Sequence, residues 1–237
     1  GAVSSFASRV HFDASTFCVQ NQASKGGGGC VLWESNAINQ HDDKWTYFEP
    51  AVSNTQQVSN NHALYGSQFA TPGVSLRIVN TTKMTTGKDN LLNPRFPKVE
   101  LLDWYGSAVR GAFAMNVDVT AKLRNSDAEL FGATSATIIH NTGEASSFQA
   151  LFSELGIQGV PRSGPHELFF ESLLDVAGSS NIERFLNTSN VLNTFVRGCT
   201  GKLFLAGSKQ CESCPVNAVL NEGIKEGEMK DVCSCNE

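Results

Sequence analysis

The sequence is poor in charged residues, and several patterns that would indicate a function directly are missing. Only 17% of the 237 residues are charged, 18 basic against 23 acidic, and no basic patch is present. Nucleic acid is therefore not an expected partner. No apolar run reaches the length of a bilayer span, so we expect no membrane insertion in this segment. No leader precedes Gly1, and we therefore expect a mature or excised piece of a longer protein.

A catalytic constellation is missing as well. Five histidines are scattered along the chain: His11, His41, His62, His140 and His166. None adjoins a Gly-x-Ser-x-Gly or Cys-Gly-Ser-Cys-Trp motif. Asp42-Asp43, directly after His41, could be interpreted as a metal site, but a solvated acidic loop explains the pair better. We therefore expect no enzymatic activity, no bound metal and no cofactor.

Asp103 is the one acidic residue with a specific expected role. It precedes Trp104-Tyr105-Gly106 in a predicted turn, where an aspartate side chain accepts hydrogen bonds from the turn backbone. A calcium ligand is the alternative, but no second acidic cluster has suitable spacing.

Short strands separated by Gly, Pro and Asn clusters fill most of the chain. In residues 114–123, Val117, Val119 and Ala121 alternate with polar residues, which predicts a half-buried strand. Similar runs occur at residues 9–12, 17–20, 30–33, 45–48, 73–79, 98–103, 134–140 and 144–151. Residues 165–177 stay ambiguous, because Pro165 and the apolar spacing fit a helix, whereas the neighbouring strands favour a strand through Phe170. The predicted fold class is all-β.

The cysteines indicate an oxidising compartment. The sequence has seven: Cys18, Cys30, Cys199, Cys211, Cys214, Cys233 and Cys235. Five lie in a tail that has few apolar residues, so we expect disulfides to stabilise it. Zinc is the alternative, but the second pair is spaced Cys-x-Cys, whereas zinc ribbons close with a second Cys-x2-Cys. Sequence order alone favours the pairs Cys18–Cys30, Cys199–Cys211 and Cys214–Cys233, with Cys235 bridging onward.

Two glycosylation sequons agree with secretion. Asn80 and Asn187 each begin an Asn-x-Ser/Thr triplet and are the predicted glycan carriers. Such triplets also arise by chance, so the cysteines are the stronger indication of an extracellular or cell-surface location.

The four glycines Gly26–Gly29 raise the question of a phosphate loop. Such a loop needs Lys-Ser/Thr and a helix after the last glycine, whereas Cys30-Val31-Leu32-Trp33 reads as a strand. The segment 18–33 instead resembles the repeat of polymorphic outer-membrane proteins, whose fold is a right-handed parallel β-helix. Asn21, Ala23 and Gly28-Gly29 hold the matching positions, and Cys18 and Cys30 stand where the family has Phe and Ala. The resemblance implies a tight corner, with a disulfide replacing an aromatic contact and Asn bonding to the next coil's backbone.

Two further resemblances follow along the chain. Residues 60–72, 99–109 and 129–170 resemble a segment of large extracellular proteins of protists and algae that looks like an immunoglobulin-like β-sandwich. Its recurrent positions fall at Asn61, Ala63, Tyr65-Gly66, Ala70-Thr71, Asp103, Tyr105-Gly106, Gly143, Phe148, Leu155, Ile157, Gly159 and Pro161. Residues 199–219 resemble an ephrin-receptor-like, growth-factor-receptor-type cysteine repeat, matched at Cys199, Gly201, Phe204, Gly207-Ser208, Cys211, Cys214 and Pro215.

Together these patterns predict three modules in series. Residues 1–64 are expected to be the terminal coils of a parallel β-helix, 65–198 an immunoglobulin-like sandwich, and 199–237 a disulfide-rich module. The function expected from them is structural, as one link of a secreted or surface filament, appendage or coat. The partners would be other segments of the parent chain or neighbouring copies, with glycans as a further candidate. The first strand-like run, at residues 9–12, would expose an edge for such a partner.

Two other functions remain open at this stage. An adhesin or receptor ectodomain would bind a ligand through loops and an exposed aromatic patch, for which the candidates are Trp33, Trp45, Tyr47 and Phe48. A polysaccharide-active β-helix enzyme would need clustered carboxylates on one coil face, and Asp13, Glu34 and Asp42-Asp43 make a poor set.

Overall fold

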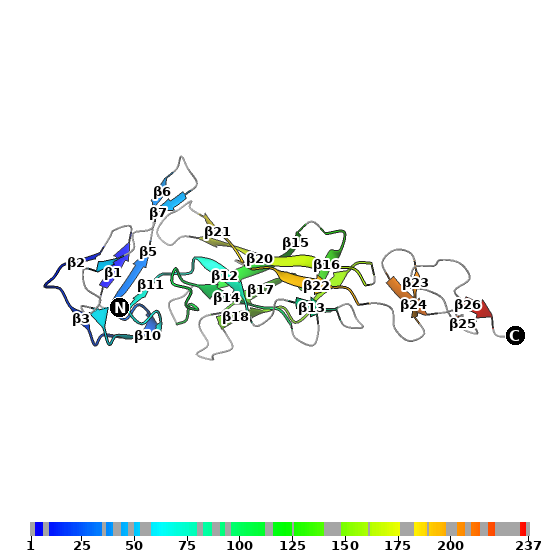
Figure 1. Cartoon of the computed structure of the whole chain (residues 1–237), viewed down its shortest axis with the longest axis horizontal. Helices are drawn as coiled ribbons and strands as arrows, with labels where there is room; N and C mark the ends of the chain where they lie inside the picture. The colour runs from blue at the N-terminus through cyan, green and yellow to red at the C-terminus, as the bar shows by residue number, and fades with distance from the viewer. Residues whose placement is uncertain are drawn as a thin grey trace.

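Strands make up the regular structure of the chain. A computed structural model describes residues 3–6, 10–34, 37–39, 44–46, 50–52, 58–79, 83–86, 91–92, 96–111, 116–124, 126–139, 148–160, 162–175, 183–188, 190–197, 203–206, 210–213, 218–220 and 233–235. These residues form 26 strands and no α-helix, so the protein is all-β, as predicted (Figure 1). This part of the chain accordingly contains no helix of the length and hydropathy that crossing a bilayer requires.

The N-terminal part is built from very short strands that pair in parallel. They are β1 (Val3–Phe6), β2 (His11–Phe12), β3 (Cys18–Val19), β4 (Gln22–Gly27), β5 (Val31–Glu34), β8 (Ala51–Val52), β9 (Val58–Ser59), β10 (His62–Tyr65) and β11 (Phe69–Ala70). β2 pairs with β8, β3 with β9, β4 with β10, and β5 with both β1 and β11. Two successive turns of chain, which we call coils, therefore lie one on the other with their strands in the same order.

The two coils keep an almost constant register. Partners are 40 residues apart in β2–β8, in β3–β9 and in β4–β10 as far as Ala23 and Ala63. They are 38 residues apart from Gly27 and Tyr65 onward through β5–β11. The parallel pairing continues through Ala70, beyond residue 64, because Phe69 and Ala70 pair with Val31 and Leu32. Along the chain, β6 (Ala37–Asn39) and β7 (Lys44–Thr46) lie between the last strand of the first coil and the first strand of the second, and they pair with each other as a hairpin.

Residues with a left-handed backbone conformation occur at equivalent corners of the two coils. Gln20 and Asn60 follow β3 and β9 with φ of 59° and 54°, and Gly28 and Gly66 follow β4 and β10 with φ of 68° and 53°. A Cβ at Gly28 would overlap the backbone of Val31. Glycine is therefore required there by both conformation and space. The strand β5 follows this corner, where a phosphate loop would need a helix.

The middle of the chain forms two larger sheets and a separate strand pair. One sheet has the order β12 (Ser75–Ile78), β14 (Lys98–Leu102), β18 (Gln149–Leu151). The other has the order β13 (Lys83–Thr85), β22 (Leu192–Phe195), β20 (His166–Asp175), β15 (Val117–Arg124), β17 (Ser135–Ile138), with β21 (Glu183–Asn187) also on β20. β16 (Glu129–Gly132) pairs with β19 (Leu155–Gln158). All these pairs are antiparallel except β13 with β22.

One apolar core joins these sheets. It takes Leu76 and Val99 from the first sheet and Val119 and Phe170 from the second, all fully buried. The rings of Phe152 and Phe170 lie 4.7 Å apart between their centroids. The burial of this core is the main stabilising contribution in the middle of the chain.

The strand predictions for this region can be compared with the structure directly, and the predicted runs at residues 73–79, 98–103, 134–140 and 144–151 contain β12, β14, β17 and β18. Val117, Val119 and Ala121 are buried in β15 while Asp118 and Lys122 are exposed, which confirms the predicted alternation. The ambiguous residues 165–177 contain a strand, because β20 pairs with β15 on one side and with β21 and β22 on the other. The apolar residues whose spacing fits a helix therefore belong to a strand that is paired on both sides.

The C-terminal residues form two further antiparallel pairs. β23 (Leu203–Ala206) pairs with β24 (Gln210–Ser213), and β25 (Ala218–Leu220) pairs with β26 (Cys233–Cys235).

Candidate functional site

The first corner is closed by a disulfide bond. Cys18 and Cys30 are joined, with their Cα atoms 5.8 Å apart, and both are buried. This is the pair that the sequence predicted. The bond closes the loop that contains the four glycines and, by restricting the unfolded chain, stabilises such a loop by about 3 kcal/mol.

The other cysteines keep their predicted status. Cys211 lies in β24, and Cys233 and Cys235 lie in β26, but only their backbone is described. Cys199 and Cys214 fall outside the described residues. The pairs Cys199–Cys211 and Cys214–Cys233, and the onward bridge of Cys235, therefore stay predictions.

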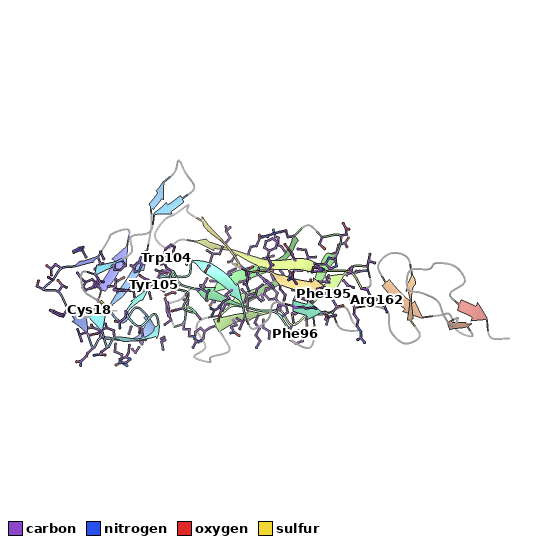
Figure 2. All side chains as sticks on the ribbon, viewed as in Figure 1. Cys18, Phe96, Trp104, Tyr105, Arg162 and Phe195 are labelled. Carbon is purple, nitrogen blue, oxygen red and sulfur yellow. A yellow bond between two sulfur atoms is a disulfide. The ribbon has the colours of Figure 1, made fainter. Side chains whose placement is uncertain are left out.

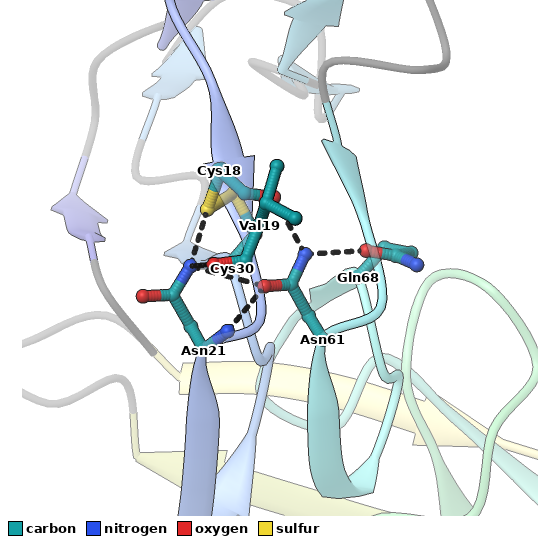
Figure 3. The surroundings of a disulfide bond; sticks show 6 residues. All are labelled: Cys18, Val19, Asn21, Cys30, Asn61 and Gln68. Carbon is teal, nitrogen blue, oxygen red and sulfur yellow. Dashed lines mark hydrogen bonds between the residues drawn. A yellow bond between two sulfur atoms is a disulfide. The ribbon is translucent and has the colours of Figure 1, made fainter.

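Two asparagines link the coils next to this disulfide (Figure 3). The side-chain Oδ1 of Asn61 accepts the backbone N–H of Asn21 at 2.8 Å and the Asn21 amide Nδ2 at 3.0 Å. The Asn61 Nδ2 donates to the carbonyl oxygen of Cys18 at 2.8 Å and to Oε1 of Gln68 at 2.7 Å. Asn61 is 3% exposed, so these bonds are closed to water. Asn61 thus bonds to the backbone of the coil before it, whereas the resemblance implied a bond from the corner asparagine to the next coil's backbone.

This asparagine pair fixes the register between the coils. A corner leaves backbone N–H and C=O groups that no strand partner can take, and burying them unpaired is costly. One amide side chain supplies both an acceptor and a donor, so it satisfies the Asn21 N–H and the Cys18 carbonyl together. A shift of either coil by one residue would break both bonds.

The parallel coils are joined to the larger sheets by a cluster of polar and aromatic groups, of which Trp33, Thr71 and Asp103 are buried and Trp104 and Tyr105 are partly exposed. We call this cluster the joint: Trp33, Tyr65, Phe69, Thr71, Asp103, Trp104 and Tyr105. Figure 2 shows Trp104 and Tyr105 between the coils and the larger sheets. The Trp33 indole Nε1 donates to the Tyr105 hydroxyl at 3.1 Å, and the two rings meet edge to face. Tyr105 also lies against the ring of Phe69. A single aromatic side chain from the turn after β14 thus contacts both coils.

Backbone bonds complete the joint. The Thr71 Oγ1 accepts the backbone N–H of Trp104 at 2.9 Å, and the Thr71 carbonyl accepts the Tyr65 hydroxyl at 3.2 Å. Burial raises the pKa of Tyr65, so its hydroxyl stays protonated and acts as the donor. Thr71 therefore ties the end of β11 to the turn that follows β14.

Asp103 organises that turn in the way that the sequence predicted. Its Oδ1 accepts the backbone N–H of Ser107 at 2.7 Å, and its backbone carbonyl accepts that of Gly106 at 3.0 Å. The residue is 1% exposed, and burial raises the pKa of its carboxyl above 3.8. Within the described residues, its Oδ2 has no hydrogen-bond partner.

Among the candidate carboxylates of the enzyme alternative, only the side chain of Asp13 is described. The Oδ1 of Asp13 accepts hydrogen bonds from Thr16 Oγ1, Ser15 Oγ and Ser15 N, and the hydroxyl of Thr16 is the main reason why its pKa falls to about 2. Asp13 thus caps an exposed turn and holds no proton at neutral pH. The side chain of Glu34 is not described, and Asp42-Asp43 fall outside the described residues.

Three of the five histidines lie in the described part of the chain, and one of them connects two loops. His166 Nδ1 lies 2.8 Å from Ser126 Oγ, and His166 Nε2 lies 2.8 Å from Ser163 Oγ. Hydroxyls donate or accept, so either imidazole tautomer satisfies both bonds. The cluster fixes the loops before β16 and β20. Across the described residues, no group of three or more His, Cys, Asp or Glu side chains is placed to hold a metal ion.

The remaining predicted residues are only partly visible. Asn80 falls outside the described residues, and Asn187 ends β21 with its side chain not described, so both glycans stay predictions. Trp33 is 1% exposed, which is the wrong environment for a member of an exposed aromatic patch. Its indole is needed in the joint instead. The side chain of Trp45 is not described, and Tyr47 and Phe48 lie outside the described residues.

Sequence reasoning missed the role of Asn61. It matched residues 60–72 to the second module and ended the first module at residue 64, whereas β10 and β11 pair with β4 and β5 of the first coil. The repeated Asn-x-Ala at residues 21–23 and 61–63 could have indicated the equivalence. No protein-family model and no curated protein matches the sequence significantly.

Proposed function

We propose that this chain is a structural link in a long, modular extracellular protein that forms a filament, appendage or coat. In this proposal residues 1–64, extended through Ala70, are terminal coils of a parallel β-helix. The residues after Ala70, up to residue 198, are an immunoglobulin-like sandwich, and residues 199–237 begin a cysteine-rich repeat. The carrying observation is the joint, through which parallel coils in fixed register continue into the larger sheets by partly buried hydrogen bonds.

A structural role fits the way these contacts are used. The disulfide, the asparagine pair and the joint all hold backbone segments in one arrangement. A link that transmits load needs such fixed contacts between successive modules. Disulfides in the tail would extend the same principle to a region that has little core.

The two alternatives have less support. An adhesin would need an exposed aromatic surface, and Trp33 is committed to the joint. A carbohydrate-cleaving enzyme would need a carboxylic acid whose pKa is raised toward neutrality beside a second carboxylate. Asp13 has the opposite shift and serves a turn.

Electron microscopy of the native source cells tests the proposal. Antibodies against residues 1–237, visualised with gold, are expected to label filaments or coat layers repeatedly and at regular intervals. Pre-absorption of the antibody with the purified chain is the control and should remove the labelling. Scattered labelling of the cell surface, together with saturable capture of a soluble ligand by the purified chain, would instead favour the ectodomain.

A further inference from the structure

The outer edge of the first coil is open along most of its length. Within the described residues, β2, β3 and β4 have a partner only toward the second coil, namely β8, β9 and β10. β5 differs, because β1 covers its outer side and the Val3 N–H donates to the Cys30 carbonyl at 2.9 Å. The outer edge of the first coil is therefore occupied along one strand and open along three.

Asn21 and Asn61 occupy equivalent positions, but only Asn61 uses its side chain fully. Asn61 reaches back to the coil before it, accepting one backbone N–H and donating to a carbonyl three residues earlier. The Asn21 Nδ2 makes local contacts with Cys18 Sγ at 3.3 Å and Val19 O at 3.4 Å, besides its bond to Asn61. Its Oδ1 has no partner among the described residues, and Figure 3 shows this oxygen directed away from Asn61.

We infer that the open edge of β2, β3 and β4 receives the rest of the coil whose last strand is β1. In that arrangement the Oδ1 of Asn21 accepts the backbone N–H at the corner of the incoming coil. Its Nδ2 turns from the local contacts to the carbonyl three residues earlier, as Asn61 does toward Cys18. This inference rests on the proposed function and names the partner of its N-terminal side.

Continuity with β1 decides between this occupant and a second copy of the chain. β1 already takes the position on β5 that β5 takes on β11, in the same parallel sense and with Val3, Val31 and Phe69 aligned. The segment leading into β1 therefore enters the open edge in register. At the opposite side of the stack, Phe69 packs on Tyr105 and the chain continues through Thr71 into the joint. Within the described residues, β8, β9 and β10 have no strand partner on that side either. The direct continuation of the chain from β1 is therefore what favours the preceding coil over a second copy.

Exposed apolar side chains at this edge support the same conclusion. Val3, Phe17 and Val19 are exposed at 38%, 66% and 38%, and they lie in or next to β1 and β3. Strands of neighbouring coils run about 4.8 Å apart, so equivalent side chains of an added coil would contact them.

A grafted coil tests the inference. A copy of residues 51–68 replaces Gly1 and Ala2 directly before Val3 in the full chain, because Phe69 and Val3 are equivalent. This copy introduces no cysteine. The expected result is a higher midpoint of thermal unfolding and slower hydrogen exchange of the amides in residues 18–27. A graft of the same eighteen residues in reversed order is the composition control and should raise neither.

Asn21→Ala makes the test specific. The substitution should lower the folding equilibrium constant, read from exchange of residues 18–27, about fivefold more in the grafted chain than in the parent chain. A second graft, with residues 11–30 as the copied coil, guards against a poor junction. The inference is overturned if neither graft raises the midpoint or if Asn21→Ala costs the same in both chains. It is also overturned if the parent chain forms a dimer that Asn21→Ala abolishes, because a second copy then takes the edge.

These results can be separated from the proposed function. Graft stabilisation without antibody labelling of filaments would retain the open-edge inference and reject the structural link. Labelled filaments without graft stabilisation would do the reverse.

Discussion

Replacing Asn61 with alanine should destabilise the coils far more than replacing Asn21. Asn61→Ala removes the only amide shared by the Asn21 N–H and the Cys18 carbonyl across the coils. Asn61 is 3% exposed, so water cannot take its place without local opening. The matched control Asn21→Ala removes an amide that serves no backbone group of another described coil.

The magnitude follows from the two backbone groups that lose their partner. A buried donor or acceptor left unsatisfied costs about 1–3 kcal/mol, so two of them cost about 3 kcal/mol after partial relaxation. Asn21→Ala loses the partly buried hydrogen bond to Asn61 Oδ1 and two long local contacts, which together contribute about 1 kcal/mol or less. The difference between the two variants, about 2 kcal/mol, is the quantity to measure.

Hydrogen exchange read by mass spectrometry suits this measurement, because the chain contains several sheets that need not unfold together. Asn61→Ala should speed exchange of the amides in residues 18–33 by about a hundredfold, while β15 serves as an internal reference with unchanged exchange. An equal effect of Asn21→Ala and Asn61→Ala would refute the reasoning, since the register would then not depend on the inward-facing amide. An acceleration of less than about threefold would refute it as well.

Four further predictions concern the rest of the chain. Thiol labelling of the native, unreduced protein should find nearly all cysteines oxidised, and four or more free thiols would contradict an extracellular location. Intact-peptide mass spectrometry should detect a glycan on Asn80 or Asn187; bare asparagines at both sites would count against a glycosylating secretory route without affecting the fold. Burial raises the pKa of Asp103 above 3.8, so its stabilising contribution is complete below the unfolded pKa and is lost as pH rises through the folded pKa. Asp103→Asn should therefore raise the urea midpoint of unfolding above that of the wild type at neutral pH, and this gain should vanish below pH 3.8. A gain that instead grows as the pH falls would show that the folded-state pKa of Asp103 is lowered. Phe170→Ala should cost about 3–5 kcal/mol in urea unfolding because Phe170 is fully buried against Phe152, and a loss below about 1 kcal/mol would show that this core is loosely packed.

Local patterns predicted much of the fold because they reflect local physics. The alternation of Val117, Val119 and Ala121 could be interpreted without any partner, since a half-buried strand has period two. Gly28 could be placed at a corner because few other residues adopt its backbone angle. The turn role of Asp103 follows from hydrogen bonds made within four residues.

Long-range pairing was harder to predict. The partnership of Asn21 and Asn61 spans 40 residues, and a shift of register within β10 separates the matching asparagines from the matching corner glycines. The apolar spacing of β20 is also compatible with a helix, and only its pairing with strands on both sides shows that it is a strand. Trp33 could not be recognised as buried, because its partner Tyr105 is 72 residues away.

The same shift of register has a consequence for how this region can change in evolution. Between the paired positions Ala23–Ala63 and Gly27–Tyr65, the first coil carries two more residues than the second. The extra length is absorbed at residues 24–26 and does not disturb the asparagine bonds on one side or the Gly28 corner on the other. A Cβ at Gly26 would meet no atom within 4 Å, so this point also tolerates larger side chains. The pairing of the coils therefore accommodates a difference of two residues at this point, while the backbone of Gly111 lies against Lys25 and Gly26 and limits the space for a longer insertion.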